Sequence, residues 1–316
     1  MTKKRLRDLG ITLGQLPTGP LNAITDVAGV RVGHSTVIQD QPHVVRTGVT
    51  AIWPAHDIYE RYCTAGFFSF NGNGELTGSH WLNEQGLLAA PIALTNTHAV
   101  GVVRDAICVD AAQRGVDNAW HLPVAGETWD GWLSDAESFP VTQQIALDAI
   151  GSATDGPVEE GCVGGGTGMI THEFKGGIGT ASRRLPTALG GWTVGVLVQS
   201  NYGVRGLLRC GNADAAMQAQ KFLRCSNASA AMQVQQCRRR KKCRTAATSA
   251  GGHRWKRSPH RWKRSPHRWK RSDPTDGKVH RSRAVDSARM MPAFILPGIS
   301  LLAARFILLS KSVRLR

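Results

Sequence analysis

Acidic residues are scarce in the last third of this sequence. Residues 1–208 hold 13 Lys and Arg against 19 Asp and Glu, whereas residues 209–316 hold 26 against 4. The net charge of +16 therefore comes from the C-terminal segment, and the front of the chain is mildly acidic. This uneven distribution excludes the front segment as a basic nucleic-acid-binding domain.

Paired cysteine motifs and an apolar leader are also missing. The seven cysteines include no Cys-x-x-Cys pair, their number is odd, and no hydrophobic run follows the basic start of the chain. These features predict reduced thiols in a cytoplasmic protein. His172-Glu173 begins a zinc-protease motif, but Gly176 stands where the second histidine is needed. We therefore predict no metal and no other cofactor.

The glycine-rich stretch Gly164–Gly168 lacks the Gly-Lys-Ser/Thr of a phosphate-binding loop. Two interpretations remain open, a phosphate site or a close approach of backbones, and the pattern favours the second because glycine has no Cβ.

Residues 1–208 alternate between strand and helix patterns. We predict two short strands about a glycine turn within 24–34, then strands within 47–54, 65–70, 91–98 and 192–200, with helices at 80–86, 100–114 and 140–150. This order predicts an α/β or α+β sandwich.

Two polar positions in this front segment are candidates for a binding or catalytic site. Glu127 lies in an acid and aromatic cluster, where its carboxylate could hold a substrate ammonium with Trp129 as a wall. A solvated loop with a packed tryptophan is the alternative. Asn201 follows a buried strand, where its amide either stabilises an oxyanion or serves as a structural cap.

Residues 209–316 differ in composition. The heptad at 253–259, His-Arg-Trp-Lys-Arg-Ser-Pro, recurs at 260–266 and again, with Asp in place of Pro, at 267–273. This composition predicts a disordered basic tail that either binds nucleic acid or anionic surfaces, or is a product of an altered reading frame. Residues 290–309 are apolar, but two prolines and Arg305 argue against a membrane span.

Six motifs in the front segment resemble, in order, the L-aminopeptidase/D-esterase (DmpA-type) family, which includes the β-aminopeptidases. They lie at 22–34, 72–78, 94–101, 164–168, 175–183 and 199–203, and the resemblance covers about residues 5–208.

The resemblance implies an α/β/β/α sandwich of the kind found in self-cleaving N-terminal-nucleophile hydrolases. It implies hydrolysis of short peptides, amides or esters by a serine whose own amino group acts as the base, without a metal, in a homo-oligomer. By matching motif, Asn201 becomes the oxyanion donor, Glu127 binds the substrate's amino group, and Trp129 lines the pocket.

The chain departs from the family after Leu208. The family has a Gly-Ser cleavage site and then a Ser-x-Glu pair, but the Gly-Ser pairs here are Gly78-Ser79 and Gly151-Ser152, and no Ser-x-Glu follows residue 208. The nucleophile is therefore unidentified, because nothing local supports Ser226 or Ser249. We expect an incomplete fold with unpaired strand edges, truncated and inactive as written.

Overall fold

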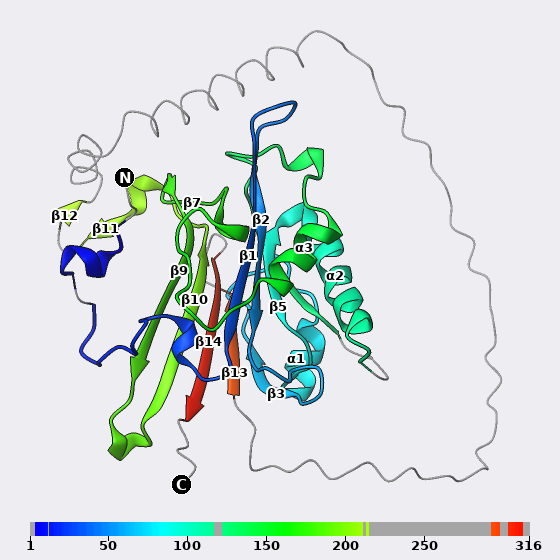
Figure 1. Cartoon of the computed structure of the whole chain (residues 1–316). Coiled ribbons are helices and arrows are strands. Elements are labelled where there is room, and N and C mark those ends of the chain that lie inside the picture. Colours follow the sequence, from blue (N-terminus) through cyan, green and yellow to red (C-terminus); the bar gives the residue numbers. More distant parts are fainter. Residues whose placement is uncertain are drawn as a thin grey trace, which may run out of the picture. The chain divides into compact units, whose positions relative to one another are not determined.

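Two β-sheets pack against each other, and helices cover one of them (Figure 1). The computed structural model describes residues 4–11, 13–116, 122–210, 213–214, 292–297 and 303–311. These residues belong to one unit that comprises residues 1–226 and 290–316.

The first sheet has four strands in the order β1-β2-β5-β6. They are β1 (Arg31–Gln39), β2 (Val45–Trp53), β5 (Ile92–Asn96) and β6 (Val124–Thr128). The β5–β6 pair is parallel and the other two pairs are antiparallel. β5 and β6 are buried throughout, as expected for strands that are covered on both faces.

The second sheet has six strands in the order β4-β3-β13-β14-β10-β9. They are β3 (Cys63–Phe67), β4 (Leu87–Leu88), β9 (Gly177–Arg184), β10 (Trp192–Ser200), β13 (Pro292–Pro297) and β14 (Ala303–Lys311). β7 (Ile170–Thr171) pairs with β8 (Phe174–Lys175), and β11 (Arg209–Cys210) pairs with β12 (Ala213–Asp214).

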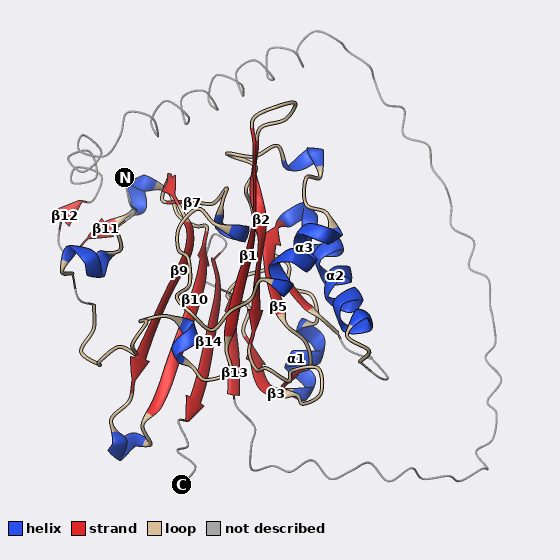
Figure 2. Ribbon diagram, viewed as in Figure 1, coloured by secondary structure: helices blue, strands red, loops and turns tan. Residues whose placement is uncertain are grey.

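The described part of the chain forms three α-helices between these strands, and Figure 2 colours the helices blue. They are α1 (Ser79–Gln85), α2 (Val100–Gln113) and α3 (Gln143–Gly151), and α2 and α3 pack on the four-stranded sheet. α1 ends at Gly86, whose φ of 67° lies in the left-handed region favoured by glycine. The side chain of Thr142 caps α3 by accepting the backbone N–H of Ile145. The predicted helices and most predicted strands are thus confirmed.

The prediction of two strands within residues 24–34 is wrong for the first of them. Ile24–Asp26 forms a 3-10 turn, and β1 begins only at Arg31. The cause is the side chain of Asp26, which accepts the backbone N–H groups of Leu21 and Ala23. Such local side-chain bonds compete with the hydrogen bonds of a strand.

Of the strand edges that an incomplete fold would leave unpaired, those of β3 and β10 are paired in the structure. β14 pairs antiparallel with β10 along nine residues, and β13 pairs parallel with β3. These two strands come from the apolar stretch 290–309 and its continuation. No helix among the described residues is long and apolar enough to cross a membrane. The basic repeats, for which we predicted disorder, lie outside the described residues.

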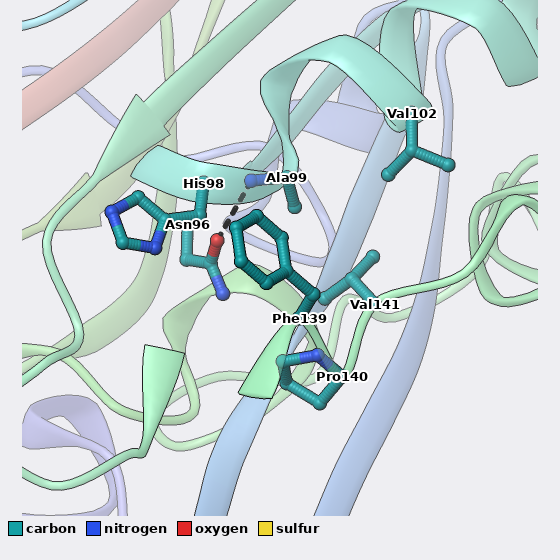
Figure 3. A pocket seen from close by; sticks show the side chains of 7 residues that line it. All are labelled: Asn96, His98, Ala99, Val102, Phe139, Pro140 and Val141. Carbon is teal, nitrogen blue, oxygen red and sulfur yellow. Dashed lines mark hydrogen bonds between the residues drawn. The ribbon is translucent and has the colours of Figure 1, made fainter. Parts of the chain in front are cut away.

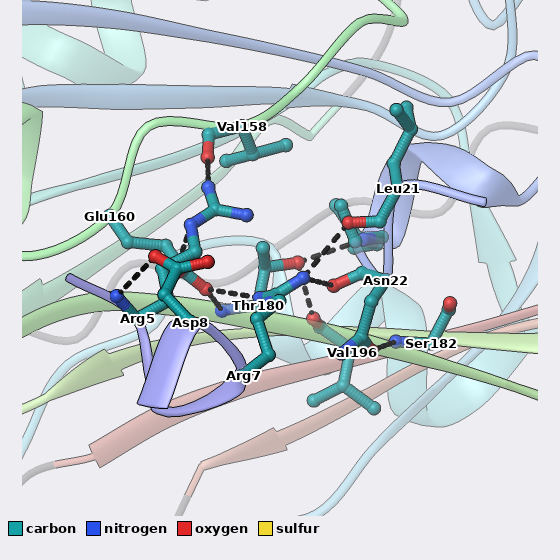
Figure 4. Close-up of polar contacts among 12 residues, drawn as sticks. Arg5, Arg7, Asp8, Leu21, Asn22, Val158, Glu160, Thr180, Ser182 and Val196 are labelled. Atoms are coloured by element: carbon teal, nitrogen blue, oxygen red, sulfur yellow. Dashed lines mark hydrogen bonds and ion pairs between the residues drawn. The ribbon is translucent and has the colours of Figure 1, made fainter. Parts of the chain in front are cut away.

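The N-terminal segment is tied to β9 by polar contacts (Figure 4). Arg5 forms an ion pair with Glu160 at 2.8 Å, and Glu160 also accepts the backbone N–H of Thr180 in β9. Arg7 donates to the carbonyl oxygens of Leu21 and Asn22. These contacts hold the segment along the edge strand of the six-stranded sheet.

Gly164–Gly168 lies between the two sheets, and we call it the glycine joint. The N–H groups of Gly164 and Gly165 donate to the hydroxyls of Thr36 and Thr50. A Cβ on Gly165 would lie 2.6 Å from the carbonyl oxygen of Leu94 and closer still to Gln199. The close-packing interpretation is therefore confirmed, because these N–H groups are already occupied by the protein.

Candidate active site

The parallel strands β5 and β6 have their carboxyl ends at the same end of the four-stranded sheet. Thr95 lies opposite Glu127, and Asn96 lies opposite Thr128. Thr97 and Trp129 therefore leave the sheet side by side. Ligands in α/β sheets commonly bind at the carboxyl ends of strands. We call the group Glu127, Thr97, Trp129, Asp130 and Asn201 the carboxylate end.

Glu127 is buried, with 6% of its surface exposed. Its Oε1 accepts the backbone N–H of Glu75 at 3.0 Å, and its Oε2 accepts the hydroxyl of Thr97. Each carboxylate oxygen has two lone pairs, so these two bonds orient the carboxylate and leave acceptor sites open.

Burial raises the pKa of the Glu127 carboxyl. The Thr97 hydroxyl and the Glu75 N–H stabilise the charged form and lower the pKa, but they do not offset the desolvation. A cation placed beside this carboxylate would stabilise its charged form. The site is thus suited electrostatically to a positively charged group.

Asn201 is the member of the carboxylate end that comes from the other sheet, where it follows β10. Its Nδ2 donates to the carbonyl oxygen of Trp129 at 2.6 Å and to the sulfur of Met169 at 2.9 Å. A side-chain amide has two N–H donors, and both have partners here. The structure therefore brings Asn201 to Trp129, two residues from Glu127, but an oxyanion would have to replace one of these partners.

A buried polar network joins the two sheets next to the carboxyl ends of β5 and β6. Gln199 in β10 donates to the carbonyl oxygen of Thr95 at 3.1 Å and to the hydroxyl of Thr128 at 2.6 Å. The Thr128 hydroxyl in turn donates to the sulfur of Met169 at 2.8 Å. The position of Asn201 relative to β6 is therefore fixed by more than its own contacts.

Trp129 is half-buried, and its ring is one of three that stack beside the carboxylate end. The His98 ring meets the Trp129 ring edge-on, with centroids 5.5 Å apart, and stacks on the Phe139 ring at the same distance. Trp129 therefore packs in an aromatic cluster, and His98 extends that cluster toward Phe139.

Sequence reasoning missed Asp130, which follows Trp129 directly. Its side chain is completely buried, and neither carboxylate oxygen has a hydrogen-bond partner of normal geometry among the described residues. Burial raises its pKa, and the nearby Thr47 hydroxyl and Asn96 amide offset only part of that rise. The Asn96 amide donates instead to the Thr47 hydroxyl at 2.9 Å.

Thr97 was also missed as a partner of Glu127. The available signal was its place in a polar run after a predicted strand, but the strand that lies beside it cannot be read from the sequence. No group of three or more His, Cys, Asp or Glu suited to a metal ion occurs in the part of the chain that is described.

Residues 22–243 match the profile of peptidase family S58. The chain is 47% identical over 215 residues to the beta-peptidyl aminopeptidase BapA of Sphingosinicella microcystinivorans, covering 66% of this chain and 54% of that protein. It is 45% identical over 214 residues to the BapA of Sphingosinicella xenopeptidilytica, covering 65% and 53%. The chain thus spans about half the length of the curated relatives it matches.

Two of the solved structures that the chain resembles are also aminopeptidases. A Burkholderia sp. beta-aminopeptidase is 52% identical with a TM-score of 0.63, over 65% of this chain and 59% of that one. An L-aminopeptidase D-Ala-esterase/amidase from Ochrobactrum anthropi, described as a serine aminopeptidase and a variant of the Ntn hydrolase fold, is 43% identical with a TM-score of 0.63, over 68% and 62%. The predicted fold class, a sandwich of this type, is therefore confirmed.

Proposed function

Because the chain belongs to peptidase family S58, we propose that its described domain binds the free amino group of short peptides, amides or esters, as the substrate-binding part of an aminopeptidase. The observation that carries the proposal is Glu127, a buried carboxylate at the carboxyl ends of β5 and β6. In this proposal Trp129 forms a wall of the site and Asn201 is the oxyanion donor.

The contacts of Glu127 support this role. The Thr97 hydroxyl and the Glu75 N–H hold its two oxygens in place, so a substrate ammonium meets an acceptor that is already oriented. Hydrogen bonds between an ammonium and a carboxylate are about twice as strong as neutral ones. The burial that raises the pKa of this carboxyl also excludes the water that would compete for the ammonium.

We further propose that the chain, as it stands, binds such substrates without hydrolysing them. Family-type catalysis uses an N-terminal serine released by self-cleavage, and residues 209–316 contain neither Gly-Ser nor Ser-x-Glu. Ser226 and Ser249, the serines considered above, lie outside the described residues. Intact-mass measurement and a p-nitroanilide amino-acid amide assay test this: we expect one unprocessed chain and no turnover. Two fragments with a new N-terminal serine, together with turnover, would overturn it.

The amine site is tested by calorimetric titration of the full chain with L-phenylalaninamide. Glu127→Gln keeps the shape of the side chain and removes its charge, so we expect affinity to fall at least tenfold, or about 1.4 kcal/mol. Glu137→Gln, an exposed residue outside the carboxylate end, is the matched control and should leave affinity unchanged. Equal loss in both variants, or no loss in either, would rule out Glu127 as the ammonium acceptor.

A second candidate function belongs to the C-terminal segment, and the heptad repeats favour it. The repeats join cations to tryptophan in three copies, and residues 209–316 carry 26 basic against 4 acidic residues. Such a segment binds nucleic acid or anionic surfaces through released counterions and stacking. Anisotropy of a labelled single strand should show affinity that falls steeply with salt. Replacing Trp255, Trp262 and Trp269 with alanine should weaken it, and binding that ignores salt would exclude this function.

Self-association and a cytoplasmic location complete the proposal. Exposed leucines in the N-terminal segment, Leu6, Leu9 and Leu13, support self-association, which sedimentation velocity tests directly. The thiols of Cys63 and Cys108 are free, which supports a reducing compartment. Fractionation of cells that express the tagged chain tests this location.

A further inference from the structure

A small pocket opens beside the carboxylate end. It has a volume of about 230 Å³ and is lined by Asn96, His98, Ala99, Val102, Phe139, Pro140 and Val141, as Figure 3 shows. Pockets for drug-sized ligands measure roughly 300–1,000 Å³. This pocket is therefore the size of a single side chain and not of a whole peptide.

The pocket offers a ligand mainly apolar surface, because five of its seven lining residues are apolar and one of its two polar side chains is already hydrogen-bonded within the protein. Of its two polar side chains, Asn96 uses both ends: its Oδ1 accepts the N–H of Ala99 at 2.9 Å, and its Nδ2 donates to Thr47 at 2.9 Å. His98 contributes a ring whose Nδ1 faces the carbonyl oxygen of Ala136 at 3.3 Å. A charged ligand group would find no partner in the Asn96 wall, whereas an apolar group loses nothing there.

Phe139 forms one wall under backbone constraint. Its φ is 47°, in the left-handed region that is rare for a bulky residue, and 68% of its surface is exposed. Strained residues persist where the surroundings hold them, and they are common at ligand sites. The conformation keeps an exposed aromatic ring stacked on His98 at the pocket.

The pocket adjoins the proposed ammonium site through consecutive residues. Thr97 donates to Glu127, and the next residue, His98, is both a wall of the pocket and an edge-on neighbour of Trp129. Because the ring centroids of His98 and Trp129 are 5.5 Å apart, we expect that one small molecule can place its amine at Glu127 and its side chain in the pocket.

We propose that this pocket receives the apolar side chain, aromatic or branched aliphatic, of a substrate whose ammonium binds Glu127. The inference rests on the proposed function and adds the substrate class to it. It predicts a preference for amides of apolar amino acids over glycinamide, because burial of the side chain removes apolar surface from water.

The test is calorimetric titration of the full chain with L-phenylalaninamide, glycinamide and 3-phenylpropanamide, which lacks the amine. We expect L-phenylalaninamide to bind at least tenfold more tightly than glycinamide. Phe139→Ala should reduce that preference severalfold, and Val102→Trp, which fills the pocket, should abolish it. Phe70→Ala removes another exposed aromatic ring, which lies outside the pocket, and should change nothing. Because Phe139 is exposed, its variant is expected to fold even if Val102→Trp does not.

The two proposals fail in different ways. If both amides bind equally and Glu127→Gln abolishes both, the ammonium site stands and the side-chain pocket is wrong. If 3-phenylpropanamide binds and Phe139→Ala weakens it, but no amine adds affinity, the pocket is an apolar site and the ammonium proposal is wrong. If Phe139→Ala leaves the preference intact and instead changes the sedimentation coefficient, the pocket is a contact between copies and the inference is overturned.

Discussion

The glycine joint and the carboxylate end both adjoin β5 and β10, but the groups that they hold there differ in kind. At the joint, the N–H groups of Gly164 and Gly165 are bonded to threonine hydroxyls, and backbones approach too closely for a Cβ. At the carboxylate end, Asp130 is buried without a regular partner, and the neighbouring Phe139 has a strained backbone. Buried side-chain atoms without a partner among the described residues also occur beside the joint, at His34 Nε2 and Gln199 Oε1. The two regions therefore differ in buried carboxylate and in strained non-glycine backbone, features that typically gather at functional sites.

The comparison predicts that mutations at the joint destabilise the fold, whereas mutations at the carboxylate end affect binding and stabilise the fold or leave it unchanged. Such a division is expected where activity requires buried charge. The tests below begin with the largest effect.

Gly165→Ala should cost about 3 kcal/mol of unfolding free energy or more, because its Cβ would collide with Gln199 and with the carbonyl oxygen of Leu94. The control is Gly179→Ala in β9, where a Cβ meets no atom within 4 Å. Urea denaturation measures both. A loss under about 1 kcal/mol for Gly165→Ala would show that the joint can relax.

His34 should make the joint sensitive to acid. Its Nδ1 lies 3.0 Å from the Thr50 hydroxyl, and burial lowers its pKa from 6.5 to about 4. Between these values the unfolded chain binds more protons than the folded one, so stability falls as the pH drops through this window. His34 should contribute about 2 kcal/mol of the loss between pH 8 and pH 5.

Urea denaturation of the wild type, His34→Gln and the exposed control His80→Gln at both pH values measures that contribution. The pH dependence should shrink in His34→Gln and persist in His80→Gln. Equal pH dependence in all three would show that His34 is not the sensitive group.

Asp130→Asn should stabilise the fold by about 1 kcal/mol at pH 7, because it removes a buried charge that lacks regular partners. Burial raises the folded-state pKa of Asp130, so the charged form destabilises the fold as the pH rises above about 3.9, the unfolded value. The gain should therefore vanish toward pH 4.

Thermal melts at pH 4 and pH 7, with the exposed Asp148→Asn as control, measure this gain. A loss of stability in Asp130→Asn at pH 7 would mean that the carboxylate has partners which offset its burial, and the contrast between the two regions would disappear.

Local patterns predicted the elements whose ends are set by nearby residues. The strand expected at 192–200 is β10, Trp192–Ser200, and the helix expected before Gly86 ends there because glycine adopts the required positive φ. The fold family also followed from short motifs. Asn201 follows a strand that was predicted, whereas Glu127 lies in β6, Val124–Thr128, which was not predicted as a strand.

Ile24 lies in a 3-10 turn because Asp26 bonds backward to the nearby backbone, a local competition that the apolar pattern does not reveal. The other differences come from contacts between distant residues. The pairing of β14 with β10 joins segments about a hundred residues apart in sequence, and no local pattern specifies such a partner. Thr97 and Asp130 were missed for the same reason, since their surroundings are created by the register of β5 with β6 and by Thr47 on β2.

The origin of β13 and β14 has a consequence for the order of assembly. The four-stranded sheet draws on residues 31–128, so all its strands are synthesised before β9 and β10. The six-stranded sheet requires residues 292–311, which are synthesised long after β3 and β10, and contacts so distant in sequence form slowly. Until then β3 and β10 have open edges, which are prone to pair with other chains. A chain that lacks residues 292–311 should therefore depend on chaperones more than a chain that contains them.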